Sequence, residues 1–416
     1  MRYLLLFGLV FLGRSSQTLN IVSYGAVGDG VTDNTTAINA CFTAAASQGK
    51  SVYVPTGVYA CNNNDVSGHI LTFNIGALSN ITIYGDGQGK SVITTSDTNA
   101  TNSNGSTLLY LYSSLRCYGL TISGLTLRST HGITQKQTTG IFYQGTSGQL
   151  IDTTLLVNTT LSGFQSAVGL QGINGINITS DSFYSPNGHD CGQHGSQNPV
   201  AFITGYDNAN GLVNNCTISG CYANGYTGPI PLNCPRPQDN FVYGTYYGIT
   251  TYGNTTRYFS QEIYLVNPQT TNPSTTAMVN IGFNNIDQSL PPGCVEDNGS
   301  PHKYNYGVRS DANNTYIHDN NFLNYTTGIL TYTVTYTSLS PTNFNYYNNH
   351  FVAASDTSRY TLPGKAINVV GYTGHPITGV NITNNTQSLT DSTNISTTNC
   401  TSPYLYNNPY SPVMLH

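Results

Sequence analysis

A short phrase recurs along this chain, and its spacing limits the possible folds more than any other feature of the sequence. Each copy runs from an apolar residue through alternating polar and apolar residues to an Asn or a pair of Asn. The clearest copies are VNNCTI at 213–218, FNNI at 283–286, YIHDNNF at 316–322, YYNNHF at 346–351 and VNITNNT at 380–386. Equivalent apolar residues of the later copies lie about 30 to 36 positions apart, a period typical of solenoids.

The alternation within each copy predicts a strand followed by a turn. Residues alternate with a period of two over short runs that Gly and Asn interrupt, which favours strands over a helical repeat. One coil of this kind cannot bury its apolar face alone, so successive coils must stack, and the repeated Asn side chains can then hydrogen-bond from coil to coil. We therefore predict an all-β fold, a single-stranded parallel β-helix. The alternative is an antiparallel β-sandwich, but a sandwich gives no reason for an Asn pair at one point of each unit.

One short amphipathic helix is predicted near the N-terminus, at 32–47. Thr32 or Asp33 is suited to cap its first turn, and one face carries a continuous apolar stripe. The stripe consists of Ala37, Ile38, Cys41, Phe42 and Ala45. Because a solenoid leaves its core and its first strand open at the end, we interpret this helix as a lid.

Three segments near the helix resemble a known family. They are IVSYGAVGDGVTDNTTAINAC at 21–41, SVYVPTGVY at 51–59 and ITIYGDGQGKSVI at 81–93. Together they resemble the N-terminal region of the pectate lyase-like superfamily of right-handed parallel β-helices, in the branch of polygalacturonase-like hydrolases and phage tailspikes. The resemblance covers about residues 20–95 and implies a three-faced β-helix that binds or acts on polysaccharide. It does not fix the reaction, because hydrolases, lyases, epimerases and non-catalytic spikes share this region.

The sequence also predicts how the chain is divided. Residues 1–16 combine Arg2, an apolar run and small residues, as in a signal peptide, and no other stretch is apolar enough to cross a membrane. We assign 17–386 to the β-helix, with a cap at 17–60, coils from about 61 and a loop insertion at about 220–264. The Ser-, Thr- and Asn-rich segment 387–416 is predicted to be a loosely ordered tail.

Composition favours a secreted or surface-displayed glycoprotein that does not bind nucleic acid. Only 7% of the residues are charged and the net charge is −5, so no basic surface for nucleic acid is expected. About fifteen N-x-[ST] triplets are potential glycosylation acceptors. They include Asn34, Asn80, Asn158, Asn177, Asn215, Asn254, Asn324, Asn381 and Asn394. The nine cysteines form no C-x-x-C pair, so structural roles are favoured over zinc, with Cys41 and Cys61 as candidates for a disulfide.

The densest polar segment of the chain, 177–199, supplies the candidate catalytic residues. Glycoside hydrolysis ordinarily needs two carboxyl groups about 5 to 9.5 Å apart, a separation that coils stacked about 4.8 Å apart provide readily. We propose acid/base roles for Asp181, Asp190 and Asp207, with His189 and His194 orienting these groups or the substrate. The alternative is a long polar loop without a catalytic role.

Polygalacturonase-like hydrolases carry N-T-D, D-D and G-H-G motifs, to which TSD at 179–181, HDC at 189–191 and QHG at 193–195 are similar. The match is partial: His189 stands at the first Asp of the D-D pair, and no R-I-K-like segment follows. These departures put the transfer of the family's catalytic roles in doubt.

The Tyr-rich segment 220–264 supplies the candidate substrate-binding residues. Flat amphipathic rings stack on the CH face of a sugar while their hydroxyl groups bind its oxygens. The candidates are Tyr226, Tyr243, Tyr247 and Arg257. The alternative is that Tyr serves here only as a good strand former.

Two classes of function follow for a monomer or homotrimer whose partner is a polysaccharide or a cell-surface glycan. The first is a glycoside hydrolase, and the alternative is a non-enzymatic spike or adhesin that only holds the sugar. A polysaccharide lyase ranks lower, because it needs a basic residue and cations to neutralise a uronate. No cofactor or metal site is predicted, and Ca²⁺ bound by Asp carboxylates is the one metal that the composition would favour.

Overall fold

The computed structural model shows how these repeats fold. It describes residues 18–96, 106–130, 138–146, 150–184, 201–206, 213–225, 234–235, 240–259, 261–265, 278–289, 294–295, 306–325, 327–332, 342–353, 365–371, 374–387, 395–408 and 413–414. The predicted signal peptide at 1–16 lies outside these residues.

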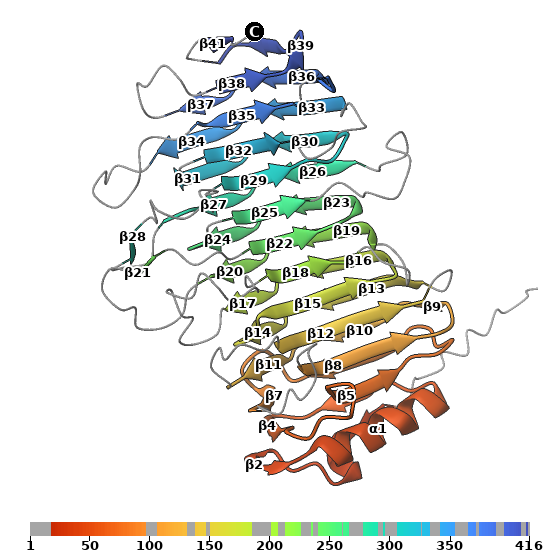
Figure 1. Ribbon diagram of the computed structural model, residues 1–416. Helices are drawn as coiled ribbons and strands as arrows, with labels where there is room; N and C mark the ends of the chain where they lie inside the picture. Colours follow the sequence, from red (N-terminus) through yellow and green to blue (C-terminus); the bar gives the residue numbers. More distant parts are fainter. Residues whose placement is uncertain are drawn as a thin grey trace, which may run out of the picture.

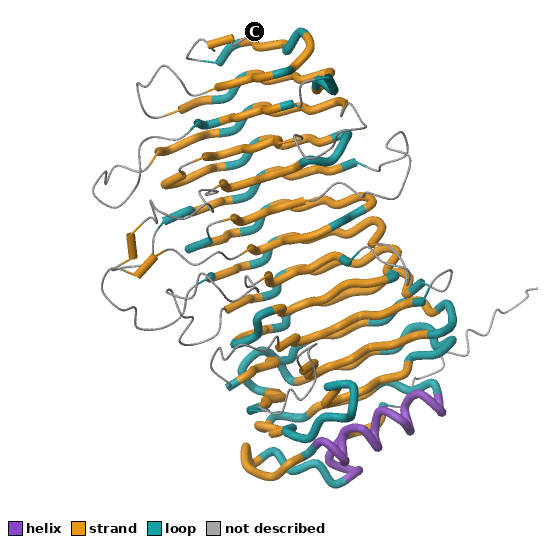
Figure 2. The backbone as a smooth tube through the Cα atoms, viewed as in Figure 1, coloured by secondary structure: helices purple, strands orange, loops and turns teal. Residues whose placement is uncertain are grey.

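The described chain winds into a right-handed parallel β-helix with three long sheets, which we name A, B and C (Figures 1 and 2). Sheet A contains β1 (Leu19–Asn20), β3 (Val52–Val54), β6 (Thr82–Gly85), β10 (Thr121–Ser123), β13 (Ile151–Val157), β16 (Ile173–Thr179), β19 (Val213–Ser219), β23 (Tyr247–Tyr252), β26 (Val279–Gly282), β30 (Thr315–His318), β33 (Thr342–Tyr347), β36 (Ile377–Thr383) and β39 (Cys400–Thr401), with β9 (Cys117–Tyr118) and β40 (Tyr404–Tyr406) pairing at its side.

Sheet B contains β2 (Asp29–Asp33), β4 (Gly57–Ala60), β7 (Ser91–Thr95), β11 (Thr126–Ser129), β14 (Thr160–Ser162), β17 (Ser182–Tyr184), β20 (Tyr222–Asn224), β24 (Thr255–Arg257), β27 (Asn285–Asp287), β31 (Asn321–Tyr325), β34 (His350–Ala353) and β37 (Thr386–Gln387). Sheet C contains β5 (His69–Asn74), β8 (Ser106–Ser113), β12 (Thr138–Gly145), β15 (Ser166–Gln171), β18 (Ala201–Gly205), β22 (Asn240–Gly244), β25 (Gln261–Leu265), β29 (Tyr306–Ser310), β32 (Thr327–Tyr332), β35 (Ile367–Val370), β38 (Ile395–Thr398) and β41 (Val413–Met414). A separate pair joins β21 (Cys234–Pro235) to β28 (Cys294–Val295).

Each coil passes through sheets A, B and C in turn, and the core lies inside the coils. Along sheet C, Leu109, Ile141 and Val168 are neighbours on consecutive strands and are fully buried. Alternate residues point outward, as the period of two requires. The apolar residues of the sequence repeat therefore stack into one continuous core, which a single coil could not form.

The predicted lid is present as helix α1 (Thr35–Gln48), at the lower end of the solenoid in Figure 1. Ile38, Cys41, Phe42 and Ala45 are buried against the first coils. The predicted cap residues are wrong, because the helix is capped by Asn34, whose side chain makes no capping hydrogen bond. Asp33 lies one residue earlier and accepts the backbone N–H of Thr35 at 3.0 Å.

The lid also covers the free edge of sheet C. The side-chain amide of Asn39 donates to the carbonyl of Ile70 at 2.9 Å and accepts the N–H of Thr72 at 2.9 Å. These are the bonds that a further strand would make to β5. Asn39 therefore occupies an edge that would otherwise be open to another chain.

The predicted Asn ladder is confirmed at the tight corner between sheets A and B. Its members are Asn254, Asn284, Asn320, Asn349, Asn385 and Asn408. Each Nδ2 donates to a backbone carbonyl of the preceding coil, and in all but Asn408, the last member, it also donates to the Oδ1 of the next Asn at 2.9 to 3.1 Å. Each Oδ1 also accepts the backbone N–H of the preceding corner residue. The ladder thus satisfies buried polar groups of the corner in every coil that it joins.

Three predicted features differ from the described structure. The segment 220–264 was expected to interrupt the coils, yet β22, β23 and β24 continue sheets C, A and B through it. Strands β38, β39, β40 and β41 also pair with the solenoid beyond residue 386, so the coils extend into the predicted tail. Cys41 and Cys61 are both buried as free thiols and form no disulfide.

Candidate functional site

The outward face of sheet C carries a row of aromatic side chains that we call the aromatic strip. The strip consists of His69 on β5, Tyr110 on β8, Phe142 on β12, Tyr206 after β18 and Tyr243 on β22. Tyr110, Phe142 and Tyr243 occupy the same register position on their strands. Because neighbouring strands lie about 4.8 Å apart, the strip extends about 24 Å along the solenoid.

Four rings of the strip, from His69 to Tyr206, contact one another in sequence. His69 stacks on Tyr110, with centroids 3.7 Å apart and planes within 8°. Tyr110 lies 6.2 Å from Phe142, and Phe142 lies 5.7 Å from Tyr206. Tyr206 remains 36% exposed at the surface. The strip is therefore a continuous apolar track with exposed ring surface.

A glycine makes this continuity possible. Gly169 on β15 takes the register position between Phe142 and Thr204. A Cβ at Gly169 would lie 2.4 Å from Cδ2 of Phe142 and 3.4 Å from the Tyr206 ring. The Phe142 side chain therefore leans over a strand without a side chain of its own, which brings it to Tyr206 two strands away.

Burial keeps the titratable side chains of the strip uncharged near neutral pH. Burial lowers the pKa of His69, although Asp65 lies 3.4 Å from its Nδ1 and opposes this effect. Burial also raises the pKa of Tyr110 to about 12, and its hydroxyl donates to the side chain of Gln144. Burial and the nearby Tyr243 raise the pKa of Tyr206. The strip therefore presents neutral rings and hydroxyl groups to a ligand.

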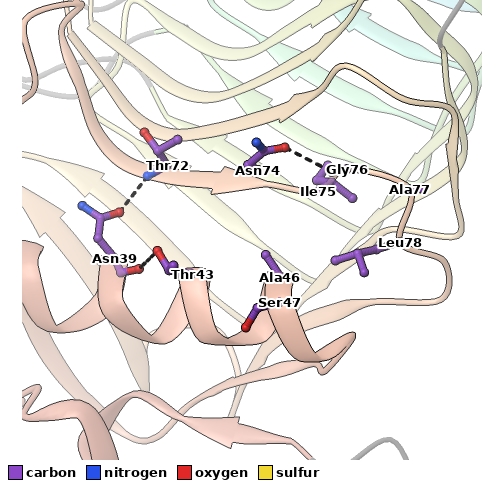
Figure 3. A pocket seen from close by; sticks show the side chains of 10 residues that line it. All are labelled: Asn39, Thr43, Ala46, Ser47, Thr72, Asn74, Ile75, Gly76, Ala77 and Leu78. Carbon is purple, nitrogen blue, oxygen red and sulfur yellow. Dashed lines mark hydrogen bonds between the residues drawn. The ribbon is translucent and has the colours of Figure 1, made fainter.

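A hollow of about 670 Å³ lies between α1 and β5, at the N-terminal end of sheet C (Figure 3). Its walls carry only uncharged side chains. They are Asn39, Thr43, Ala46, Ser47, Thr72, Asn74, Ile75, Gly76, Ala77 and Leu78. Thr72 and Asn74 are the register neighbours of Tyr110 and Tyr112 on β8. The hollow therefore adjoins the aromatic strip.

Further along sheet C, an ion pair replaces the aromatic rings. Arg309 on β29 donates to Asp311 at 2.7 Å and 3.1 Å, and Asp311 is 1% exposed. Burial raises the pKa of Asp311, while the Arg309 guanidinium opposes that rise. Because its guanidinium and the carboxylate of Asp311 pair with each other, Arg309 offers a ligand little net positive charge.

The predicted substrate-binding residues lie on three different faces of the solenoid. Tyr243 points outward from sheet C and belongs to the aromatic strip. Tyr247 lies on β23 of sheet A, and Arg257 lies on β24 of sheet B. Arg257 contacts Asp287 at 3.6 Å and covers the Tyr258 ring at 4.5 Å. These residues therefore do not form one groove, and Tyr226 lies outside the described residues.

Asp181 is the one predicted catalytic residue that the structure describes. Its side chain points inward at the corner between β16 and β17 and is 1% exposed. Burial raises the pKa of this carboxyl to about 7, and backbone amides of Thr159 and Thr179 oppose the rise. A buried carboxyl group does not reach a glycan on the surface, so Asp181 is not part of the proposed site. Asp190, Asp207, His189 and His194 lie outside the described residues.

The strip residues that sequence reasoning missed had a detectable signal. TLLYLYS at 107–113 and TGIFYQG at 139–145 place Tyr110 and Phe142 at equivalent positions. Aligning successive strands of sheet C would have shown this column. No such signal in the sequence marks Tyr206 or His69. Tyr206 reaches Phe142 only because Gly169 lies between them, and His69 lies at the first strand of sheet C, next to the cap.

Two searches of the described ranges concern metal ligands and membrane-spanning helices. Within them, no three His, Cys, Asp or Glu side chains are close enough to hold a metal ion. The described residues therefore give calcium no site of that kind. No helix in the same part of the chain is long and apolar enough to cross a membrane.

The three sheets define a single-stranded right-handed parallel β-helix protein. A family model for rhamnogalacturonase A/epimerase, pectate lyase-like, matches residues 18–270. The chain belongs to this pectate lyase-like family.

Solved structures share the fold at low sequence identity. PfbA, a surface adhesin of Streptococcus pneumoniae, has a TM-score of 0.58 and 12% identity, covering 96% of each chain. The tailspike protein of Escherichia coli bacteriophage HK620, solved with a pentasaccharide, has a TM-score of 0.57 and 12% identity over 94% of this chain and 65% of that chain. At these identities the likeness is one of fold.

A curated relative matches only a short segment. The non-secreted LysM effector LysM19 of Penicillium expansum is 48% identical over 44 residues, which are 11% of this chain and 4% of that protein. This match therefore says little about the function of the whole chain.

Proposed function

We propose that this protein binds a polysaccharide along the outward face of sheet C. The observation that carries the proposal is the aromatic strip, in which aromatic side chains follow one another for about 24 Å across neighbouring coils and four of them contact in sequence. Aromatic rings with hydroxyl groups combine an apolar surface with a polar tip, which matches the apolar face and hydroxyl rim of a sugar ring. The family and the fold are compatible with such a ligand, since adhesins and tailspikes also use this fold.

The strip favours a glycan whose sugar rings are neutral where they contact it. His69, Tyr110 and Tyr206 carry no charge near neutral pH, because burial shifts their pKa values toward the neutral forms. The cation of Arg309 is neutralised by Asp311. A lyase would instead require cations around a uronate, and Arg257 lies on sheet B, so the described residues give that reaction little support.

We further propose that the bound glycan is hydrolysed by Asp190 and Asp207, with His189 and His194 as orienting residues. In the sequence, His189, Asp190 and His194 stand between β17 and β18, and Asp207 directly follows Tyr206 of the strip. Hydrolysis would use one carboxyl to protonate the leaving oxygen and the other to activate water or attack the sugar. The protein would act outside the cell or at a surface.

The alternative is a surface protein that holds the same glycan without cleaving it. One observation favours this alternative: Asp181, one of the three carboxylates predicted for catalysis, is buried in the core of the solenoid. A binding-only protein needs the strip and no pair of exposed carboxylates. The two functions therefore share a site and differ in the chemistry at its edge.

The test combines binding and cleavage on a panel of neutral and acidic polysaccharides. Retention on immobilised glycans measures binding, release of reducing ends measures cleavage, and ultraviolet absorbance of an unsaturated uronate measures lyase activity. The variants are Phe142→Ala on the strip and Asp190→Asn at the proposed catalytic pair. Tyr247→Ala is the matched control, because it removes a half-buried aromatic ring from sheet A.

Each outcome separates the candidates. Loss of binding with Phe142→Ala but not with Tyr247→Ala supports the sheet C site. Cleavage without unsaturated product, abolished by Asp190→Asn while binding persists, establishes the hydrolase. Binding without cleavage of any glycan establishes the adhesin-like function. Equal binding by wild type and Phe142→Ala contradicts the proposed site.

A further inference from the structure

The N-x-[ST] triplets are unevenly distributed over the described structure. Many lie in sheet A or in the corners at its two ends, namely Asn80, Asn158, Asn177, Asn215, Asn254, Asn313, Asn381, Asn384 and Asn399. Asn324 lies on sheet B, and Asn34 directly precedes α1. No described strand of sheet C contains the Asn of a triplet, although the triplets that begin at Asn104 and Asn394 end within β8 and β38. The face that carries the aromatic strip is therefore without acceptors in its strands.

Three exposed acceptors gather on consecutive coils. Asn158 follows β13, Asn177 lies in β16 and Asn215 lies in β19, and these strands pair directly. All three residues are exposed. Among the described residues, no hydrogen bond holds the side chain of Asn158 or Asn177, and Asn215 makes one long contact of 3.4 Å to Asn174. Their amide nitrogens therefore face solvent on one side of the solenoid.

Backbone conformation gives a reason for Asn at two of these three positions, but not at the third. Asn158 and Asn215 have φ values of 51° and 52°, in the left-handed region that Asn tolerates well. Asn177 lies within an extended strand and has no positive φ. Neither backbone strain nor hydrogen bonding explains Asn177, which is followed by Thr179 at the acceptor spacing.

Two other triplets cannot carry an oligosaccharide in the folded protein. Asn34 is 1% exposed, and its side chain bonds Val27 in both directions at 2.6 and 3.0 Å. Asn254 is also 1% exposed and belongs to the Asn ladder. Attachment of a sugar at Nδ2 would remove these donors and require space inside the core.

We propose that Asn158, Asn177 and Asn215 carry N-linked oligosaccharides, which cover the middle of sheet A and leave sheet C free. The donor is an oligosaccharide linked to a lipid diphosphate, as secretory pathways supply. The amide Nδ2 forms a bond to the anomeric carbon of the sugar, the bond from that carbon to the diphosphate oxygen breaks, and Nδ2 loses a proton. The electron pair leaves with the lipid diphosphate. This inference rests on the triplets and their exposure, and it does not depend on the glycan-binding proposal.

The test uses the full chain secreted by a eukaryotic host. An endoglycosidase that converts each glycosylated Asn to Asp, followed by peptide mass spectrometry, identifies the occupied positions in the unmodified sequence. The variants Thr160→Ala, Thr179→Ala and Thr217→Ala each remove one acceptor triplet while keeping its Asn. Thr36→Ala is the matched control, because it removes the buried triplet at Asn34 and its own side chain is exposed.

We expect occupancy at Asn158, Asn177 and Asn215 and none at Asn34 or Asn254. Each of the three Thr variants then loses the mass of one oligosaccharide, whereas Thr36→Ala keeps the full oligosaccharide mass of the wild type. Secreted folded protein without sugar at these three positions overturns the proposal, and so does occupancy at Asn34 or Asn254. Mapping the occupied Asn residues in the wild-type protein tests the proposal even where a variant fails to fold.

Discussion

The carboxylate of Asp181 accepts the backbone N–H of Thr159 at 2.6 Å, across the corner between two successive coils. The same link joins Asn254 to the N–H of Cys221 at 2.9 Å and recurs along the Asn ladder. Asp181 therefore occupies the same corner position as the ladder residues, two coils before Asn254, with Cys221 between them. Its second oxygen, Oδ2, is buried and accepts or donates no hydrogen bond among the described residues. An Asn would place a donor there.

The first prediction is that Asp181→Asn stabilises the protein at neutral pH. Burial raises the pKa of Asp181 from 3.8 to about 7, so the folded state holds a proton that the unfolded chain releases at lower pH. Stability is therefore fully present below about pH 4, falls as the pH rises toward 7, and is lowest above that. At pH 8 the substitution should raise the free energy of unfolding by up to about 4 kcal/mol.

Urea denaturation at pH 4 and pH 8 measures this difference. Asp181→Asn should gain stability only at the higher pH. Asn254→Asp is the reciprocal variant, since it places a carboxyl in an Asn rung, and it should lose stability as the pH rises. If Asp181→Asn is as stable as wild type at both pH values, burial of Asp181 does not make the stability of the protein depend on the protonation of this carboxyl.

A second prediction concerns the ladder itself. Asn284 is 2% exposed, donates to Asn320 and to Thr251, and accepts from Asn254. Asn284→Ala leaves these buried partners without hydrogen bonds, so it should lower the free energy of unfolding by about 2 to 4 kcal/mol. Asn321→Ala is the control, because its amide bonds Asn285 on the exposed surface of sheet B and should cost less than about 1 kcal/mol. Similar losses for the two variants would mean that the ladder adds no special stability.

The solenoid and its lid were predictable because both depend on short-range patterns. Asn pairs such as Asn284–Asn285 mark the corners of the later coils, and the stripe that contains Ile38 and Phe42 marks the helix. The ladder position of Asp181 was not predictable from local chemistry. Its sequence neighbours Ser180 and Ser182 suggest an exposed polar turn, and only the fold shows that Asp181 is buried and bonds Thr159 of the preceding coil.

The binding residues were harder to predict because sequence proximity does not indicate a shared face. Tyr243 and Tyr247 are four residues apart, yet a corner of the coil turns them onto sheets C and A. Tyr110 and Phe142 are 32 residues apart and lie side by side. In a solenoid, residues one coil apart are neighbours. The residues of a site are therefore found by comparing paired positions on successive strands, and not by their closeness in the sequence.

A third prediction tests the role of Asn39 at the free edge of sheet C. Asn39→Ala removes both bonds to β5, so it should lower the free energy of unfolding by about 1 to 2 kcal/mol and raise the tendency to aggregate. Urea denaturation and light scattering measure these effects. Thr43→Ala, one turn further along α1, is the control and should leave the aggregation rate unchanged. Aggregation that rises equally in both variants would point to loss of the helix and not to an exposed edge.

The last prediction concerns the glycine beneath the aromatic strip. A Cβ at Gly169 would meet the Phe142 ring at 2.4 Å, so Gly169→Ala should push that ring away from Tyr206 and break the continuous track. We expect the affinity for the retained glycan to fall about tenfold, or about 1.4 kcal/mol, while the fold persists.

A double-mutant cycle with Phe142→Ala separates this effect from a general disturbance of β15. Once the ring is absent, Gly169→Ala has nothing to displace, so it should change the affinity little further. Additive losses in the double variant would show that Gly169 acts through the backbone of sheet C. A coupling energy close to the single loss would show that it acts through Phe142, which would make the position of that ring a determinant of binding.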